Sequence, residues 1–75
     1  MNLSDEIKYV RQKAFLTQAE FAKELHVSFS TVNRWENGKG KPNLSALKSI
    51  KQFCEVHDLS YTSLEAEWFN CSSNN

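Results

Sequence analysis

Residues 16–38 read LTQAEFAKELHVSFSTVNRWENG, and this stretch decides the expected fold. It opens on a helix start, because Thr17 stands three positions before Glu20, which is the spacing of a capping box. In such a box the two side chains accept hydrogen bonds from backbone N–H groups that the helix leaves unpaired. Apolar residues then recur at helical spacing. The sequence therefore predicts a helix over residues 18–25.

A second helix is expected after a very short gap. Ser28 is the next residue of a type that caps helices well, and Gly38 is of the type that ends them. The pattern predicts a helix over residues 29–37. Only a tight turn fits between the two helices, and His26 lies in it. Histidine is one of the few residues other than glycine that are enriched at positive φ, so we expect His26 to close the first helix in that conformation.

The helix over residues 29–37 is expected to have two different sides. Val32 and Trp35 define an apolar side that faces the core. The opposite side is polar, and Phe29 is exposed at its start. The polar residues are Ser30, Asn33, Arg34 and Asn37. A short helix mounted firmly on another, with a polar outward face, suits insertion into the major groove of DNA.

The rest of the chain predicts three more short helices. One covers residues 4–13 and is capped by Asn2 or Ser4. One follows Asn43 and another follows Ser60, each a good capping residue. The first of these helices has apolar residues at helical spacing, namely Leu3, Ile7, Val10 and Ala14. On the helix after Asn43 the expected core positions are Leu44, Leu47, Ile50, Phe53 or Cys54, and His57. On the last helix the apolar residues are Leu64, Trp68 and Phe69.

Composition limits the class of protein. Seventy-five residues, 40% of them apolar, suffice for one compact core, so we expect a single domain over residues 1–70 and a disordered tail over 71–75. No apolar run reaches the roughly 18 residues of a membrane span, and the charged N-terminus does not resemble a signal peptide. A cytoplasmic protein that does not contact a membrane is expected.

The net charge of zero conceals an asymmetry along the chain. All nine Lys and Arg residues lie between Lys8 and Lys51, and the chain up to Lys51 also holds five acids, which gives it a net charge of +4. The four acids after Lys51 have no compensating base. The first part therefore suits contact with phosphates, and the last part suits solvent or another protein.

The stretch from about Leu3 to Leu64 closely resembles the helix-turn-helix family of phage repressors, Cro proteins and xenobiotic-response-element-type regulators. The motif LTQAEFAKELHVSFSTVNRWENGKGKP carries the resemblance: a Thr-Gln pair opens its first helix, Val-Ser marks the turn and Trp-Glu-Asn-Gly closes the second helix. The chain departs from the family pattern in three places. His26 stands where the family usually has a turn glycine, and Phe29 where it often has a polar residue. The segment CEVHD lengthens the link between the fourth and fifth helices. The resemblance implies an all-α, lambda-repressor-like compact bundle of five short helices, with the helix-turn-helix formed by the second and third.

The resemblance also implies which residues read DNA. In the family the first half of the third helix meets base edges. Arg34 is then the candidate for guanine, because its fork can pair with O6 and N7, while Ser30 and Asn33 read adenine or bond a phosphate. Phe29 cannot hydrogen-bond, but its ring can press on a thymine methyl group. The alternative is a solvated face, with Phe29 folded back against the preceding helix.

Phosphate contacts are expected on both sides of this helix. Gln18 lies at a helix start, where free N–H groups and the positive dipole end attract an anion, and it can also brace Phe29. The full expected set is Gln18, Ser28, Thr31, Asn37, Lys39 and Lys41. Such contacts orient a protein without reading sequence. By the resemblance, Arg11 and Glu36 form a structural ion pair that ties the first helix to the end of the third.

Other chemistry is weakly supported. Cys54 and His57 can place two metal ligands on one helix face, but zinc sites need four at better spacing, so no metal or cofactor is expected. No nucleophile–base pair or glycine-rich phosphate loop is evident, so no enzyme is expected. The terminal apolar stripe is either core or a two-fold contact between copies. It consists of Tyr61, Leu64, Trp68 and Phe69.

The expected function is that of a sequence-specific regulator of transcription, a repressor or autoregulator. By the resemblance it is encoded by a bacterium or phage, is associated with the nucleoid, and binds a pseudo-palindromic operator in double-stranded DNA as a homodimer. One alternative is an antitoxin or accessory subunit of a toxin–antitoxin, restriction-modification or phage system, in which the acidic, aromatic C-terminal segment binds a partner protein. Another is a helical protein-interaction domain that has lost DNA binding.

Overall fold

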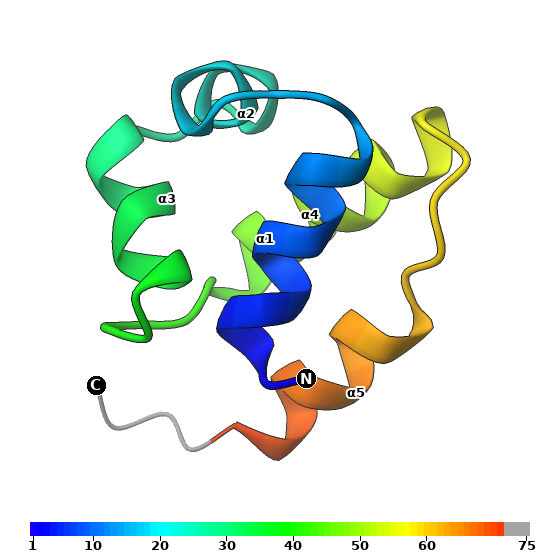
Figure 1. Ribbon diagram of the computed structural model, residues 1–75. Helices are drawn as coiled ribbons and strands as arrows, with labels where there is room; N and C mark the ends of the chain where they lie inside the picture. Colours follow the sequence, from blue (N-terminus) through cyan, green and yellow to red (C-terminus); the bar gives the residue numbers. More distant parts are fainter. Residues whose placement is uncertain (72–75) are drawn as a thin grey trace.

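The computed structural model describes residues 1–71, and this part consists of five α-helices without a strand. The helices are α1 (Leu3–Lys13), α2 (Gln18–Leu25), α3 (Phe29–Glu36), α4 (Leu44–Val56) and α5 (Thr62–Asn70). In Figure 1, α1 lies in the middle of the molecule, α2 is seen nearly end-on at the top, and α3 lies to one side. α1 packs against α3 and α5, and α2 packs against α3 and α4. The all-α prediction is confirmed. Most of the expected tail, residues 72–75, lies outside the described residues.

The helix starts follow from their caps. The Thr17 hydroxyl accepts a hydrogen bond from the Glu20 N–H at 3.1 Å, and the Glu20 carboxylate accepts one from the Thr17 N–H at 2.9 Å. The predicted capping box is therefore confirmed. Of the two candidate caps for α1, Asn2 is the one used, since its side-chain oxygen accepts from the Asp5 N–H at 2.9 Å. Asn43 caps α4 as expected.

Four of the described helices end in the same backbone motif. α1, α2, α3 and α4 are each followed by a residue at positive φ, and the next N–H group donates to a carbonyl five residues back. This is the Schellman motif, which satisfies carbonyls at a helix C-terminus. The left-handed residues are Phe15 (φ 61°), His26 (φ 60°), Gly38 (φ 72°) and Asp58 (φ 57°). The prediction of positive φ at His26 is confirmed, and this conformation ends α2 sharply, so that only a short turn separates it from α3.

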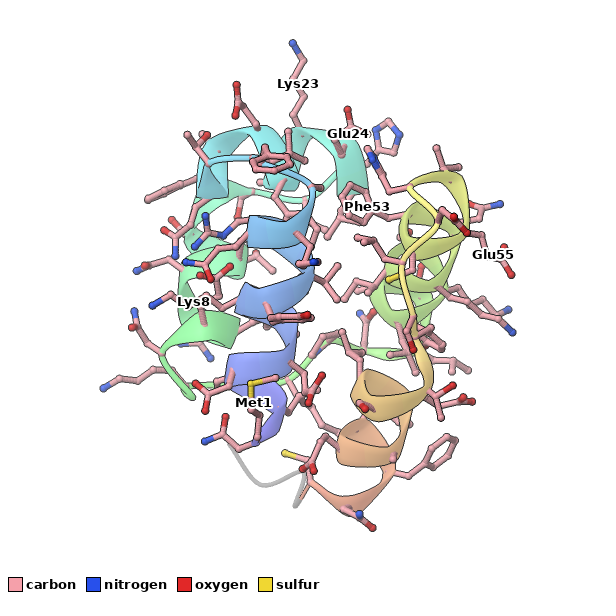
Figure 2. The ribbon with its side chains drawn as sticks, turned by 45° about the vertical axis from the view of Figure 1, so that its right-hand side comes forward. Met1, Lys8, Lys23, Glu24, Phe53 and Glu55 are labelled. Carbon is pink, nitrogen blue, oxygen red and sulfur yellow. The ribbon has the colours of Figure 1, made fainter. Side chains whose placement is uncertain are left out.

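The core is built from the apolar stripes of all five helices. Phe21 of α2 and Phe53 of α4 meet edge to face, with ring centroids 5.0 Å apart. Figure 2 shows Phe53 pointing inward, while Lys23 and Glu55 project into solvent. The buried apolar residues are Leu3, Ile7, Val10, Phe21, Ala22, Leu25, Val32, Trp35, Leu47, Ile50, Phe53, Cys54 and Leu64. Burial of Val32 and Trp35 fixes the inward side of α3, and with it the side that faces outward.

Three expectations for the second half of the chain were wrong. Leu44 is 60% exposed, because it lies roughly 110° around α4 from the centre of the buried stripe. His57 follows the last residue of α4 and is exposed, although its ring stacks on Phe53. Ser60 does not cap α5, which starts after Tyr61 without a side-chain cap. Of the two alternatives for Phe69, a core position is excluded, because its side chain is 70% exposed and lies roughly 140° around α5 from the buried Leu64.

In the part of the chain that the structure describes, no helix is both long and apolar enough to span a membrane.

Candidate nucleic-acid interface

The outward side of α3 is the candidate interface. Ser30, Arg34 and Asn37 are exposed, and Asn33 is half-buried. Phe29 is 53% exposed, so its ring is not folded away into the interior. Four polar side chains therefore share one solvent-facing surface of a well-formed helix. The surface offers both donors and acceptors, which is what recognition of base edges requires.

Arg34 does not extend freely from this surface. Its Nη2 atom donates a hydrogen bond to the carbonyl oxygen of Lys39 at 2.9 Å. The sequence pattern did not indicate this contact, because it depends on how the loop after α3 turns back. The remaining N–H groups of the guanidinium are not used by that bond. One N–H group of the Arg34 guanidinium thus binds the loop, and the others are available to a ligand.

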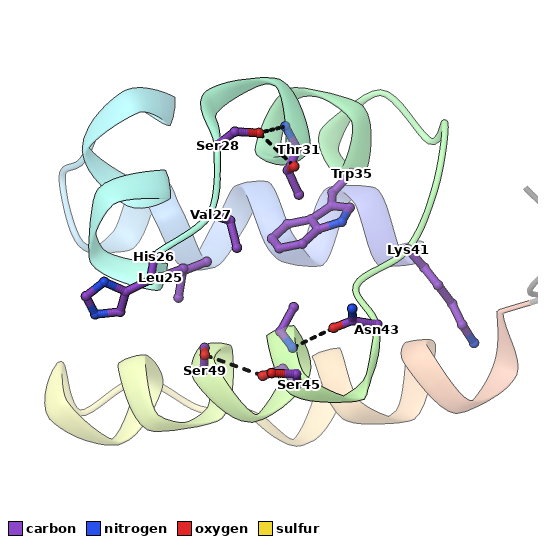
Figure 3. Close-up of a pocket in the computed structure, with 11 residues that line it drawn as sticks. Leu25, His26, Val27, Ser28, Thr31, Trp35, Lys41, Asn43, Ser45 and Ser49 are labelled. Atoms are coloured by element: carbon purple, nitrogen blue, oxygen red, sulfur yellow. Dashed lines mark hydrogen bonds between the residues drawn. The ribbon is translucent and has the colours of Figure 1, made fainter.

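Ser28 and Thr31 lie at the edge of α3 that faces α4. The Ser28 hydroxyl accepts from the Thr31 N–H at 3.1 Å, and the two hydroxyl groups are 2.8 Å apart. Figure 3 shows both residues beside a groove of about 560 Å³ between α3 and the start of α4, into which the Trp35 ring projects. Because one of these hydroxyl groups donates to the other, only one hydroxyl donor of the pair remains for a phosphate.

Gln18 belongs to a hydrogen-bond network that the sequence pattern did not reveal. Its Nε2 atom donates to Glu36 Oε1 at 3.0 Å. The same carboxylate accepts from Arg11 Nε at 2.7 Å and from Arg11 Nη2 at 2.9 Å, a bidentate pair. Arg11 also donates to the Leu16 carbonyl at 2.9 Å. This bonding to Glu36 raises the pKa of Arg11, so the guanidinium stays charged. The network joins α1, α2 and α3.

The two lysines of the following loop differ in their surroundings. Lys39 is exposed next to Asn37, as a phosphate contact requires. The ammonium group of Lys41 instead lies 3.3 Å from the carbonyl oxygens of Trp68 and Cys71, and 4.2 Å from the centre of the Trp68 ring. Figure 3 shows Lys41 directed away from α3 and toward the end of α5. Its positive charge is thus placed on the carbonyls at the C-terminus of α5, where a helix dipole favours a cation.

The terminal apolar stripe is mostly committed inside the molecule. Leu64 is only 1% exposed, so it belongs to the core and cannot be a contact between copies. Trp68 is half-buried and its indole N–H donates to the Pro42 carbonyl at 2.7 Å. Tyr61 is half-buried, and its hydroxyl donates to the Leu47 carbonyl at 3.4 Å. Phe69 alone of the stripe presents a largely exposed side chain.

Metal and thiol chemistry has little basis in this fold. Within residues 1–71 there is no group of three or more His, Cys, Asp and Glu side chains placed to hold a metal ion. Cys54 is fully buried, and burial raises the pKa of its thiol to about 11. A protonated, buried thiol is a poor ligand and a poor nucleophile. His57, the other member of the pair considered from the sequence, is exposed.

Comparison with known proteins identifies the class. Residues 7–58, more than half of the chain, match the model of the family described as helix-turn-helix. The chain belongs to this family, whose members are of the Cro and C1 type. The matched range includes α2, the turn at His26 and α3. No solved structure gives a significant match.

Three curated proteins are similar to about two thirds to three quarters of the chain. It is 38% identical over 56 residues to the HTH-type transcriptional activator BcrR of Enterococcus faecalis, covering 75% of this chain and 28% of BcrR. It is 36% identical over 52 residues to the antitoxin HigA-2 of Vibrio cholerae serotype O1, covering 68% and 50%. It is 38% identical over 55 residues to the type II methyltransferase M.SsoII of Shigella sonnei, covering 69% and 14%. The chain thus spans half or less of each relative.

Proposed function

We propose that this chain is a sequence-specific regulator of transcription that binds double-stranded DNA and reads the major groove with α3. The observation that carries the proposal is the two-sided burial of α3. Val32 and Trp35 anchor the helix in the core, and the side with Ser30 and Arg34 remains open to solvent. A recognition helix needs this combination of rigid mounting and accessible polar groups. The transcriptional activator among the relatives supports the same class of function.

The proposed mode of action is occupancy of an operator as a homodimer, with repression or autoregulation as the result. Arg34 is assigned to a guanine, Ser30 and Asn33 to neighbouring base edges, and Phe29 to a thymine methyl group. Lys39, Asn37 and the start of α2 are assigned to phosphates. Lys41 is left out of this set, because its ammonium group is bonded to α5. Neither a cofactor nor a catalytic step is part of the mechanism.

Selection of bound duplexes from a random pool tests this function. We expect enrichment of one motif with two half-sites about 34 Å apart, one turn of the DNA helix. Arg34→Ala should remove the preference at a single base pair in each half-site. Asn70→Ala, on α5, should leave the motif unchanged. A pool that shows no enrichment after repeated rounds at low salt would refute sequence-specific binding and would favour the reading as a protein-interaction domain.

A second candidate is a DNA-docking antitoxin or accessory subunit that binds a partner protein through its C-terminal segment. Similarity to an antitoxin over half of that protein's length supports it, as does the exposed Phe69 beside the acidic Glu65. The test is co-expression with the product of the adjacent gene, followed by size-exclusion chromatography. Phe69→Ser should prevent formation of such a complex and leave DNA binding unchanged. Unchanged elution of this chain in the presence of the neighbour would exclude that neighbour as a partner.

A further inference from the structure

The backbone after α3 is fixed where it meets Arg34. Gly38 adopts φ 72°, and the Lys39 N–H donates to the Arg34 carbonyl at 2.9 Å, which completes the Schellman motif of α3. The carbonyl of the same Lys39 accepts the hydrogen bond from Arg34 Nη2 at 2.9 Å. The two residues are therefore joined twice, once through the backbone and once through the guanidinium. The acceptor for the guanidinium stands at a position set by the end of the helix.

Gly40 leaves the space that the guanidinium occupies. A Cβ atom at this position would lie 3.1 Å from Arg34 Nη2 and 3.9 Å from Cζ and Nε. The backbone of Gly40 is not left-handed, so its conformation does not call for glycine. At Gly38, by contrast, the backbone has positive φ, a conformation that favours glycine. The absence of a side chain at Gly40 thus bears on Arg34 and not on the turn.

We propose that the Lys39 carbonyl and Gly40 form a seat that positions the Arg34 guanidinium for base recognition, which makes Gly40 a specificity-determining residue. The inference rests on the proposed function, because it concerns how Arg34 would read its base pair. Arginine has five N–H groups, and the seat uses one of them. A fork that is already oriented loses less side-chain freedom when it pairs with a base edge. An oriented guanidinium also adapts less to a base edge in the wrong position than a flexible side chain would.

Substitutions at Gly40 test the seat, with the duplex selected above as probe. Gly40→Ala and Gly40→Val should reduce the preference at the Arg34-dependent base pair by about three- to tenfold, with valine the stronger. Affinity for an unrelated duplex should change by less than about twofold, because the phosphate contacts remain. Both variants should keep the wild-type melting temperature to within a few degrees, since the atom that must move is the end of a flexible side chain. Lys39→Ala is the matched control, because it retains the carbonyl: all duplexes should bind more weakly and the preference should persist.

A double-mutant cycle separates the seat from other effects. In an Arg34→Ala background, Gly40→Val should change the preference no further. Full preference in both Gly40 variants, or an additional loss in that background, would overturn the proposal. Loss of the proposed function is distinguishable, because the wild-type chain itself would then bind no duplex selectively. In that case the NMR order parameter of the Arg34 Nε–H group in the free protein decides: it should fall in Gly40→Val, and an unchanged value would overturn the seat.

Discussion

At the scale of single residues, the helix ends carry conformational strain. Three of the four left-handed positions that follow α1 to α4 hold residues other than glycine, namely Phe15, His26 and Asp58. A side chain at positive φ costs roughly 1 kcal/mol relative to glycine, because Cβ crowds the backbone. Phe15 also gains little from packing, since its side chain is 93% exposed. The chain therefore keeps its sharp helix ends at some cost in stability.

Phe15→Gly should stabilise the fold. Removing Cβ relieves the strain, and we expect a gain of about 1 kcal/mol and a rise in Tm of roughly 4–8 °C. Thermal unfolding followed by circular dichroism measures it. Phe15→Ala is the control, since it removes the ring and retains Cβ, and it should not show the full gain. An alanine variant as stable as the glycine variant would mean that the exposed ring, and not the backbone, was the cause.

Cys54 predicts a pH dependence of stability. Burial, with a smaller contribution from the charge of Glu55, raises the pKa of its thiol from 9.0 to about 11. Between these values the unfolded chain loses this proton and the folded chain keeps it, so the unfolded state binds fewer protons and the free energy of unfolding falls as pH rises. The loss should approach about 2–3 kcal/mol across this window. Urea unfolding at stepped pH measures it.

Cys54→Val provides the comparison, because valine fills a similar volume and cannot ionise. Burial also raises the pKa of Tyr61, so both proteins should share a further decline at high pH. Parallel curves for the wild type and the variant between pH 9 and pH 11 would show that the thiol does not contribute.

At the scale of elements, a single carboxylate connects three helices. Glu36, at the end of α3, accepts hydrogen bonds from Arg11 of α1 and Gln18 of α2. Its side chain is almost fully buried, so the charge relies on these donors instead of water. The orientation of α3 relative to α2, on which any use of its outward side depends, rests partly on this network.

Glu36→Ala should lower stability by about 3 kcal/mol, because the largely buried Arg11 guanidinium loses its partner. We expect DNA binding to weaken at temperatures where the fold still holds, since α3 is less firmly mounted. Calorimetry and duplex binding measured on the same sample check both effects. Glu24→Ala, which removes an exposed carboxylate from α2, should change neither. A Glu36→Ala protein that melts at the wild-type temperature would rule out the structural role.

α5 is attached to the loop before α4 through polar contacts as well as through Leu64. The Trp68 N–H donates to the carbonyl of Pro42, which is itself buried. Trp68→Phe would leave that carbonyl unpaired, and we expect a loss of about 1–3 kcal/mol. In Trp68→Phe, hydrogen exchange should become faster in α5 by a larger factor than in α1, relative to the wild type. Phe69→Leu, at an exposed position of the same helix, should be neutral; equal effects of the two substitutions would contradict the role of the hydrogen bond.

At the scale of the whole molecule, charge is divided along the chain despite a net charge of zero. The first 51 residues carry +4 and the remainder −4. α3 and the loop with Lys39 belong to the positive part, and α5 belongs to the negative part. A neutral protein can therefore still attract a polyanion on one side. Association should be governed by the lysines and arginines near α3 and not by the total charge.

Salt titration of duplex binding tests this division. Each phosphate contact contributes about −0.9 to the slope of log K against log salt on duplex DNA. Lys39→Ala should make the slope shallower by roughly that amount. Lys51→Ala removes the same charge from an exposed site on α4, outside the proposed contacts, and should leave the slope unchanged. Equal changes in both variants would indicate that only net charge matters.

The sequence by itself determined the elements that local interactions specify. Caps such as Thr17, Ser28 and Asn43 lie within three residues of the N–H groups they satisfy, and apolar periodicity marks the inward side of α3. The positive φ at His26 followed from the same local rules. The structure kept the predicted bounds of α2 and moved those of α1 and α3 by one residue.

Only the tertiary structure decided how distant residues use their side chains. Lys41 lies in a loop that reads as a phosphate contact, yet its ammonium group is bonded to carbonyls 27 and 30 residues further along. Leu64 and Trp68 lie about one turn apart on α5, and packing buries the first fully, while the indole N–H of the second donates to the carbonyl of Pro42, 26 residues earlier in the chain. Gln18 lies at a helix start that suits a phosphate, yet its side-chain amide donates to Glu36, 18 residues further along. Periodicity encodes a direction around a helix axis, whereas these outcomes depend on which other element or loop stands in that direction.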